Sequence, residues 1–280
     1  MFSLNYAPPA DDLREFISSY YVFRAELPAV TDVMRADFAQ IRFLLRGCGF
    51  YRFSDGRVDG CPAAMVTGPT SAALAFNAIG PLEVFGISLL PAGWAAFIGC
   101  DSSELADKVE DASAIFGSLI NEIYGALGST GSFETRVSIA NVALRALLHH
   151  NRQVPGWFTG ATENWLIGAL SPEIDELMRT TGLSARQLER MTNRIYGAPP
   201  KLLARKYRAL RAASSIGAGH GDWQDVAGEA FYDQSHFIRE FRRFVGMTPS
   251  AFQNEPPPVT RLTLERRKLV GTLPRIILES

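Results

Sequence analysis

The feature that most constrains the fold is an internal repeat in the last 110 or so residues of this 280-residue chain. Residues 171–203 align on residues 220–252, and matching side chains fall at matching positions. The aligned pairs are Ile174 with Trp223, Leu177 with Val226, Leu183 with Tyr232, Leu188 with Phe237, Arg190 with Arg239, Arg194 with Arg243, Ile195 with Phe244, Gly197 with Gly246 and Pro200 with Pro249. A repeat of this kind indicates that one supersecondary unit occurs twice.

The first copy predicts two short helices joined by a tight turn. Ser171-Pro172 is expected to begin the first helix, as an N-cap followed by proline at the first helical position. Gly182 allows the positive φ that a sharp turn needs. Ser184 and Gln187 have the spacing of a capping box at the start of the second helix, which Gly197 is expected to end.

The second copy repeats this layout. Asp222 and Asp233 are expected to cap helices over 223–230 and 234–245, and Gly246 closes the second of them. Residues 200–215 predict one long helix between the copies. Two helices joined by a tight turn, the second carrying exposed arginines, form a helix-turn-helix unit, so the chain is expected to contain two such units.

The distribution of charged residues indicates a nucleic-acid partner for this region. The net charge of the chain is only −1. Residues 1–162 carry 11 basic and 16 acidic side chains, whereas residues 171–215 carry 9 basic and 4 acidic ones. Positive charge is therefore concentrated where a phosphate backbone would need it.

The first hundred residues indicate β structure. Short runs rich in aromatic and β-branched residues at 20–23, 40–45, 49–53, 63–67 and 82–89 alternate with turn signals such as Ser54-Asp55-Gly56 and Gly80-Pro81. This spacing predicts a cupin-like antiparallel barrel or sandwich. Helical periodicity follows from about Ser102, and the fold class is α+β. The apolar stripe on residues 132–150 can pack on the barrel or form a dimer interface, with Arg136 and Arg145 facing water.

The sequence offers little support for catalysis. Histidine is absent before His149-His150, the cysteines at 48, 61 and 100 have no metal-binding spacing, and no long apolar run or secretion signal occurs. We therefore expect no enzyme activity, no catalytic residue, no metal and no cofactor, and a cytoplasmic location. Phe43, Phe76, Phe85 and Trp94 can line an effector pocket or belong to the core. No effector-binding residue is assigned.

Residues 171–253 resemble the AraC/XylS family of transcription regulators. The resemblance rests on Gly182-Leu183-Ser184-Ala185-Arg186-Gln187-Leu188-Glu189-Arg190, Lys201-Leu202-Leu203-Ala204-Arg205, Phe231-Tyr232-Asp233-Gln234-Ser235-His236-Phe237 and Gly246-Met247-Thr248-Pro249-Ser250. The N-terminal part, with Phe85-Gly86-Ile87 before Leu90-Pro91-Ala92-Gly93, is similar to the sensor domain of one branch of that family.

The resemblance implies that both second helices enter the major groove of duplex DNA. Carried over by position, the base-facing residues are Arg186, Gln187, Arg190, Gln234, Ser235 and Arg239. The residues expected at phosphates are Arg194, Lys201, Arg205, His236 and Arg243. The first unit departs from the second at Met178, opposite Ala227, and at Thr192, where the family has an aromatic residue like Phe241.

These expectations combine into three parts: a sensor or dimerisation domain at 1–155, a DNA-binding domain at 156–255 and a basic C-terminal tail at 256–280. The predicted function is sequence-specific regulation of transcription, modulated by a small-molecule effector or by dimerisation. Expected partners are double-stranded DNA, an effector, a second copy of the chain and, for an activator, RNA polymerase, with no membrane. Two alternatives stay open: a ligand-independent DNA binder whose N-terminal domain only dimerises, and a DNA-repair or metal enzyme fused to a helix-turn-helix module. The tail can add phosphate contacts or an edge strand.

Overall fold

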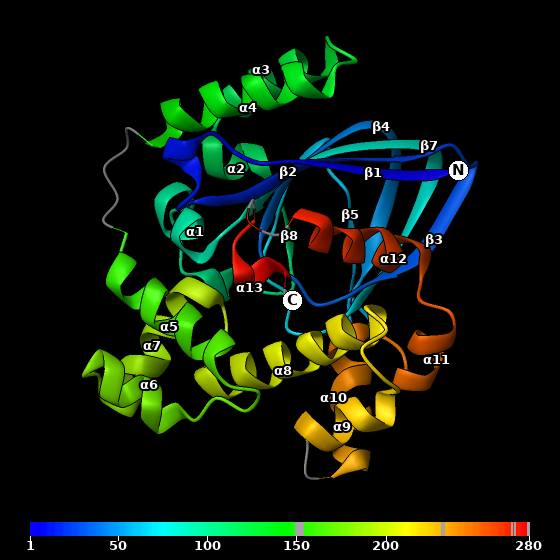
Figure 1. The fold of residues 1–280 in the computed structure, drawn as a ribbon. Coiled ribbons are helices and arrows are strands. Elements are labelled where there is room, and N and C mark those ends of the chain that lie inside the picture. The colour runs from blue at the N-terminus through cyan, green and yellow to red at the C-terminus, as the bar shows by residue number, and fades with distance from the viewer. Residues whose placement is uncertain (149–153, 231–232, 270, 272, 279–280) are drawn as a thin grey trace.

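A computed structural model describes the whole chain except residues 149–153, 231–232, 270, 272 and 279–280. A curved antiparallel sheet occupies the N-terminal part, helices α3 and α4 lie on one side of it, and the helices of the second half of the chain lie on the other side, around α8 (Figure 1). This arrangement is the α+β layout that the sequence predicts, with an antiparallel sheet first and helical units after it.

The described residues form one eight-stranded sheet with the order β1-β2-β7-β4-β6-β8, in which β3 also pairs with β7 and β5 with β4. The strands are β1 Phe2–Ala7, β2 Ile17–Ala25, β3 Ala29–Met34, β4 Gln40–Arg52, β5 Val58–Gly60, β6 Ala64–Thr67, β7 Leu74–Leu89 and β8 Val109–Asp111. The long strands β4 and β7 pair along most of their length and form the centre of the sheet.

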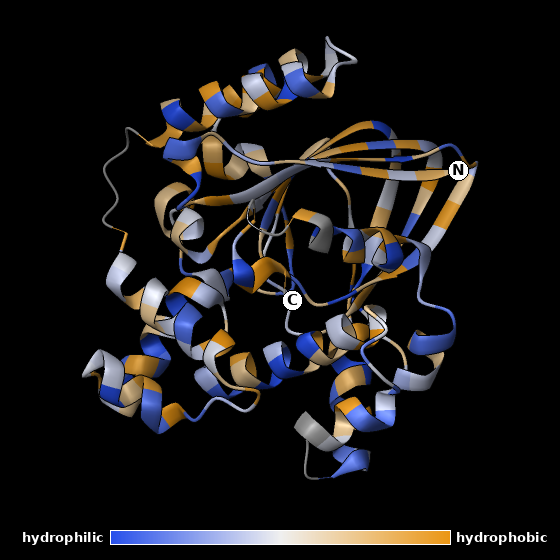
Figure 2. Cartoon of the chain, viewed as in Figure 1, coloured by the Kyte–Doolittle hydropathy of each residue, from blue (hydrophilic) through white to orange (hydrophobic). Residues whose placement is uncertain are grey.

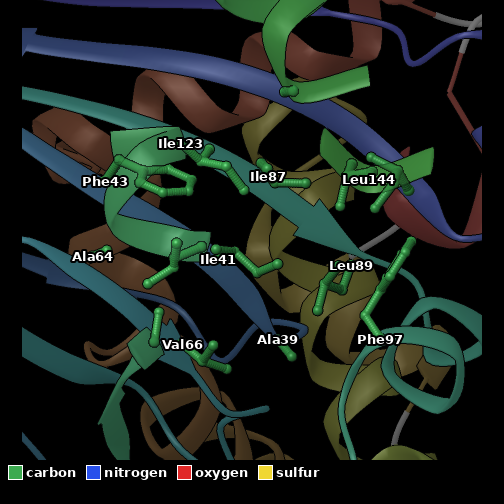
Figure 3. Close-up of a cluster of buried hydrophobic side chains, with 14 of the residues drawn as sticks. Ala39, Ile41, Phe43, Ala64, Val66, Ile87, Leu89, Phe97, Ile123 and Leu144 are labelled. Carbon is green, nitrogen blue, oxygen red and sulfur yellow. The ribbon is translucent and has the colours of Figure 1, made fainter. Parts of the chain in front are cut away.

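One face of the sheet forms the main hydrophobic core. Alternate side chains of β4 and β7, among them Ile41, Phe43, Ile87 and Leu89, point to this face and are almost fully buried (Figure 3). The α1–α4 region covers them, and Leu144 of α4 lies in the same cluster. The apolar stripe predicted on residues 132–150 therefore packs on the sheet as far as the structure describes it, up to Leu148, which is one of the two outcomes that the sequence left open.

The opposite face of the sheet carries a second cluster. It includes Tyr21, Phe23, Leu44, Tyr51 and Phe76, the residues that alternate with those of the main core. Period-two alternation thus gives each long strand two buried faces. This second face is covered by a segment from the C-terminal end of the chain.

The helices that follow β7 are α1 Pro91–Phe97, α2 Ala112–Phe116, α3 Leu119–Gly128, α4 Phe133–Leu148, α5 Gly156–Gly168, α6 Ile174–Thr181, α7 Ala185–Tyr196, α8 Pro200–Gly217, α9 Trp223–Ala230, α10 Gln234–Val245, α11 Pro249–Asn254, α12 Pro258–Leu264 and α13 Arg275–Leu278. Short 3-10 turns occur at η1 Asp11–Leu13, η2 Ser102–Glu104 and η3 Glu265–Leu269. Along the C-terminal helices, hydrophobic residues alternate with hydrophilic ones (Figure 2), as expected for helices with one buried side. In the described part of the chain, no helix combines the length and apolar character needed to cross a membrane.

Several local predictions are wrong. Strands β1 and β3 lie outside the predicted runs, and the runs at 40–45 and 49–53 form one continuous strand with irregular register. Gly80-Pro81 lies inside β7 instead of forming a tight turn. Arg136 is only 3% exposed, because its guanidinium donates to Glu83 at 2.8 Å and to the carbonyl of Leu127 at 3.0 Å. The predicted helix end at His149-His150 lies outside the described residues.

The described part of the C-terminal tail contains the helices α12 and α13 and the turn η3, so Leu262 and Leu264 lie on α12 and not on an edge strand. Val259 and Leu262 pack against the second face of the sheet. Further along, Ile276 and Ile277 join the core of the first helix-turn-helix region. The tail therefore lies between the two halves of the molecule (Figure 1).

Candidate functional site

The first helix-turn-helix unit consists of α6 and α7. Gly182 ends α6 in the left-handed conformation, with φ of 69°. The Ser184 hydroxyl accepts from the backbone N–H of Gln187 at 3.4 Å, and the Gln187 side chain accepts from the N–H of Ser184 at 3.0 Å. This capping box is confirmed. The predicted cap at Ser171 is wrong, because α6 begins after Glu173 and the Ser171 hydroxyl accepts from Arg208 instead.

The second unit, α9 and α10, repeats this local design. The Asp233 carboxylate caps α10 by accepting from the N–H of Ser235 at 2.9 Å, as predicted. Gly246 ends α10 with φ of 91°. Phe231 and Tyr232, which belong to the family motif, lie outside the described residues. The connecting helix α8 is also confirmed, over Pro200–Gly217.

The N-terminal halves of the two second helices are open to solvent. All six residues predicted to face DNA bases are exposed: Arg186, Gln187 and Arg190 on α7, and Gln234, Ser235 and Arg239 on α10. Within each helix, residues four apart share one side, so Arg186 lies next to Arg190 and Ser235 next to Arg239. The amide oxygen of Gln187 is used in the capping box, which leaves its NH₂ group for other partners.

The C-terminal ends of the same two helices contact the N-terminal half of the chain. At the end of α7, a Cβ on Gly197 would lie 2.6 Å from Pro69, and at the end of α10 a Cβ on Gly246 would lie 2.4 Å from Val33. Ala36 donates its N–H to the carbonyl of Phe244 at 2.8 Å. Gly197 and Gly246, which are equivalent in the repeat, thus each end a helix against the sheet domain, and neither has room for a side chain there.

The five residues predicted at phosphates have different surroundings. Lys201 is exposed at the start of α8. Arg205 is held by Glu240 of α10 through two hydrogen bonds of 2.7 and 2.6 Å, and this carboxylate is 5% exposed. Burial raises the pKa of Glu240, but Arg205 lowers it further, and the net pKa is below the ordinary value, so the pair stays ionised.

Of the other three, Arg194 and Arg243 contact the N-terminal half of the chain, and His236 lies near the start of α10. Arg194 lies 3.8 Å from Asp101, and both side chains are more than half exposed. Arg243 donates to the carbonyl of Ser71 at 3.4 Å. His236 is half-buried near the start of α10, and its charge contributes to the lowered pKa of Glu240. Arg194 and Arg243 thus each have a partner in the N-terminal half of the chain.

A buried lysine strengthens the contact between the halves. Lys206 of α8 is 5% exposed and donates to the carbonyls of Asp37 and Thr70, each at 2.8 Å. Burial lowers its pKa to about 8, although Asp37 and Asp107 raise it. Phe38 packs on Tyr207 beside it, with ring centroids 5.8 Å apart. The connection between β3 and β4 is therefore attached to the helix that joins the two helix-turn-helix units.

A cavity of about 110 Å³ lies on the second face of the sheet. Its lining is largely aromatic and aliphatic, and it contains the guanidinium of Arg42, which is 6% exposed. Nε of Arg42 donates to the Tyr21 hydroxyl at 2.9 Å and to the Gln40 amide oxygen at 3.0 Å, and Nη1 donates to the Tyr51 hydroxyl at 2.5 Å. Burial raises the pKa of Tyr51 to about 12, so this hydroxyl stays protonated.

The sequence identified little of this cavity. Of the four aromatic candidates, Phe76 lines it, whereas Phe43, Phe85 and Trp94 belong to the main core on the other face. Arg42, Tyr21 and Tyr51 were missed. A signal was present, because Arg42 interrupts an otherwise apolar strand between Ile41 and Phe43. Among the described residues, no group of three or more His, Cys, Asp or Glu side chains is arranged to hold a metal ion.

Comparison with known families gives two matches in different parts of the chain. Residues 177–255 match a family described as a helix-turn-helix domain, and residues 5–111 match a family described as a domain of unknown function (DUF6597). Comparison with curated proteins gives no match.

Solved structures with a similar arrangement include ToxT from Vibrio cholerae O395 bound to (E)-4-(8-methylnaphthalen-1-yl)but-3-enoic acid, with 9% identity and a TM-score of 0.49 over 90% of this chain and 98% of that one. Unsaturated-fatty-acid-bound ToxT from V. cholerae strain SCE256 has 10% identity and a TM-score of 0.47, over 90% and 94%. The AraC-like activator CuxR has 14% identity and a TM-score of 0.29, over 76% and 87%.

The helix-turn-helix match begins within α6 and covers α7, α8 and the second unit. These are the elements that the capping box of Ser184, the cap at Asp233 and the left-handed glycines define. Residues 177–255 therefore form a helix-turn-helix domain of the AraC type, the DNA-binding part of a transcription regulator, and a domain that matches a different family precedes it.

Proposed function

We propose that the chain reads a specific duplex sequence with both α7 and α10, and that its N-terminal domain adjusts this binding. One observation carries the proposal: in both units the N-terminal half of the second helix is exposed, while its terminal glycine rests on the sheet domain. The base-reading residues and the sensing domain are thus at opposite ends of the same two helices.

The exposed side chains suit base edges. Arg186, Arg190 and Arg239 can each make two hydrogen bonds to guanine O6 and N7, and Gln234 can do the same with adenine N6 and N7. Ser235 and the free NH₂ of Gln187 can each make single hydrogen bonds. None of the three arginines has a hydrogen-bond or ion-pair partner among the described residues, so no internal interaction has to break when DNA binds.

Phosphate contacts would fix the orientation without reading sequence. We propose Lys201 as the first such contact, because it is exposed and forms no ion pair in the described part of the chain. His236 is placed near the start of α10, where helix N–H groups also favour an anion. Arg205 would act mainly by holding Glu240, so that α8 and α10 keep their relative position.

The N-terminal domain would sense a small molecule. The cavity on the second face of the sheet supports this interpretation over a domain that only dimerises, because a purely structural domain has no need for a buried guanidinium in a cavity. A homodimer, a cytoplasmic location and, for an activator, contact with RNA polymerase are further parts of the proposal. The proposed boundaries of the parts are 1–155, 156–255 and 256–280.

The proposal is tested by binding of the purified chain to its own upstream intergenic DNA and to a scrambled duplex of equal length, over a series of salt concentrations. We expect the upstream DNA to bind about 10³-fold more tightly or better, with affinity for both duplexes falling as salt rises. Equal affinity for the two duplexes at every salt concentration, with and without candidate metabolites, would contradict the proposed function.

A further inference from the structure

We propose that the cavity under the C-terminal tail is a site for a small monoanion, a carboxylate with an apolar body, and that residues 258–266 form its cover. This inference rests on the proposed function, because it names the class of effector and the segment that responds to it. We call residues 258–266 the cover segment.

The lining of the cavity contains more positive than negative charge. Two arginines line it, Arg42 from β4 and Arg266 from η3, and each is 6% exposed. Asp37 is the acidic residue in the lining. Its carboxylate already accepts from the N–H of Phe38 at 2.8 Å and from the Gln40 amide at 3.0 Å. The lining therefore has a net charge of +1, which one anionic group would neutralise.

The guanidinium of Arg42 is held by neutral groups. In the described part of the chain, it has no carboxylate within 4.0 Å, and the oxygens that it contacts are those of Tyr21, Tyr51 and Gln40. Burying a charge without an opposite charge is costly, and a carboxylate forms the strongest hydrogen bonds that a guanidinium can make. The geometry thus favours a ligand carboxylate at Arg42.

The walls around these polar groups are apolar. They are formed by residues such as Phe23, Leu44, Met65, Phe76 and Val84. Such a lining favours an apolar body and gives a sugar or nucleotide few hydrogen-bond partners. A volume of about 110 Å³ is smaller than that of ordinary ligand pockets, which hold roughly 300–1,000 Å³. This volume therefore favours a small carboxylate.

The cover segment closes the cavity from one side. Strands and the connections between them form the walls, except where Val259, Thr263 and Arg266 complete the lining. The cover segment is attached to β3 and the residue after it, because Val259 donates its N–H to Asp32 at 2.8 Å and Arg35 donates to Thr263 at 3.4 Å. It is therefore a separate element that lies across an otherwise open face.

The cover segment also contacts the DNA-binding region. Leu264 packs with the core of the second helix-turn-helix unit, where a Cβ on Gly217 at the end of α8 would lie 2.6 Å from it. The segment follows α11 with only residues 255–257 between them. An anion that holds Arg266 in the cavity would therefore fix the same segment that packs on α8, and this links occupancy of the cavity to the second unit.

The test uses the full chain and two matched pairs of probes, butyrate with butyramide and benzoate with benzamide, measured by calorimetry and ligand-observed NMR without DNA. We expect at least one carboxylate to bind about tenfold or more tightly than its amide. Arg42→Met removes the charge and keeps much of the volume, so it should abolish this preference. Arg52→Met is the matched control on the same strand, because Arg52 is exposed and outside the cavity, and it should retain the preference.

A second readout is hydrogen exchange of the backbone amides over 259–266 in the wild-type chain. The carboxylate should slow this exchange and the amide should not, because only the carboxylate gives Arg266 an anionic partner. Equal affinity for carboxylates and amides, no binding of either carboxylate at millimolar concentration, or a preference that survives Arg42→Met would overturn the inference. None of these results bears on DNA selectivity, which is measured separately, so the proposed function can stand where this inference fails.

Discussion

Arg239→Ala is expected to weaken binding to the operator by about 5- to 150-fold, which corresponds to the roughly 1–3 kcal/mol of one base contact made by two hydrogen bonds. Binding to a scrambled duplex should change little. Arg239 is exposed on α10 and has no internal partner in the described part of the chain, so its removal costs nothing in the folded protein. The loss is therefore confined to the base that it reads.

Arg190→Ala should have an effect of the same size, because Arg190 has the equivalent position on α7. The two helices belong to separate units with separate cores, so the two free-energy losses should add in the double variant. Lys201→Ala provides the contrast. Loss of a phosphate contact should weaken binding to all duplexes alike and reduce the slope of log affinity against log salt concentration by about one. If Arg190→Ala and Arg239→Ala also weakened scrambled and operator DNA equally, both arginines would be phosphate contacts and the assignment of base-facing residues would be wrong.

Gly86→Ala is expected to destabilise the fold by about 3 kcal/mol or more, which corresponds to roughly 6–12 °C in the melting temperature of a domain of this size. A Cβ at this position in β7 would lie 2.0 Å from the ring of Tyr21. That ring cannot move away at low cost, because its hydroxyl donates to Gln40 at 2.5 Å and accepts from Arg42 at 2.9 Å. Thermal and chemical unfolding measure the loss.

Gly125→Ala is the matched control for this substitution. Gly125 lies within α3, and a Cβ added there would have no other atom within 4 Å, so alanine should stabilise the helix by about 0.5–1 kcal/mol. In a Tyr21→Ala background, Gly86→Ala should cost much less stability than in the wild type, and a double-mutant cycle measures this difference. A Gly86→Ala variant as stable as the wild type would show that Tyr21 does not pack on β7 as described.

The helix-turn-helix region could be predicted well from the sequence because its signals are local. The capping box of Ser184 and Gln187, the cap at Asp233 and the left-handed glycines at 182, 197 and 246 all act within a few residues of their own helix. The N-cap prediction at Ser171 is wrong because it considered only neighbouring residues. Its hydroxyl is engaged by Arg208 of α8, a partner that the local pattern of a helix start does not include.

For the sheet domain, the sequence predicted β structure but not the individual strands and their partners, because the pairings join residues that are distant in the sequence. Strand β3 pairs with β7, and its alternation Thr31-Asp32-Val33 contains an aspartate that the local pattern does not favour in a strand. Asp32 lies there because it accepts the N–H of Val259 from the tail. Arg136 is a similar case, because its partner Glu83 comes from the centre of the sheet.

The cavity could not be found from the sequence for a related reason. Alternation along β4 places Arg42 on the opposite face from Ile41 and Phe43, which in an ordinary antiparallel sheet is the face in contact with water. The tail covers that face, and the contacts of Val259 and Thr263 become visible only in three dimensions. In the same way, the partner of Arg205 comes from α10, so the sequence alone could not distinguish a phosphate contact from an internal ion pair.

The central claim, that two equivalent helices each read part of one site, is tested most directly by selecting bound sequences from a pool of random duplexes with the wild-type chain and with the Arg190→Ala and Arg239→Ala variants. We predict two enriched half-sites whose centres are about 10–10.5 base pairs apart, one lost in each variant. A pool with no enriched sequence, or enriched bases that persist unchanged in both variants, would contradict the claim.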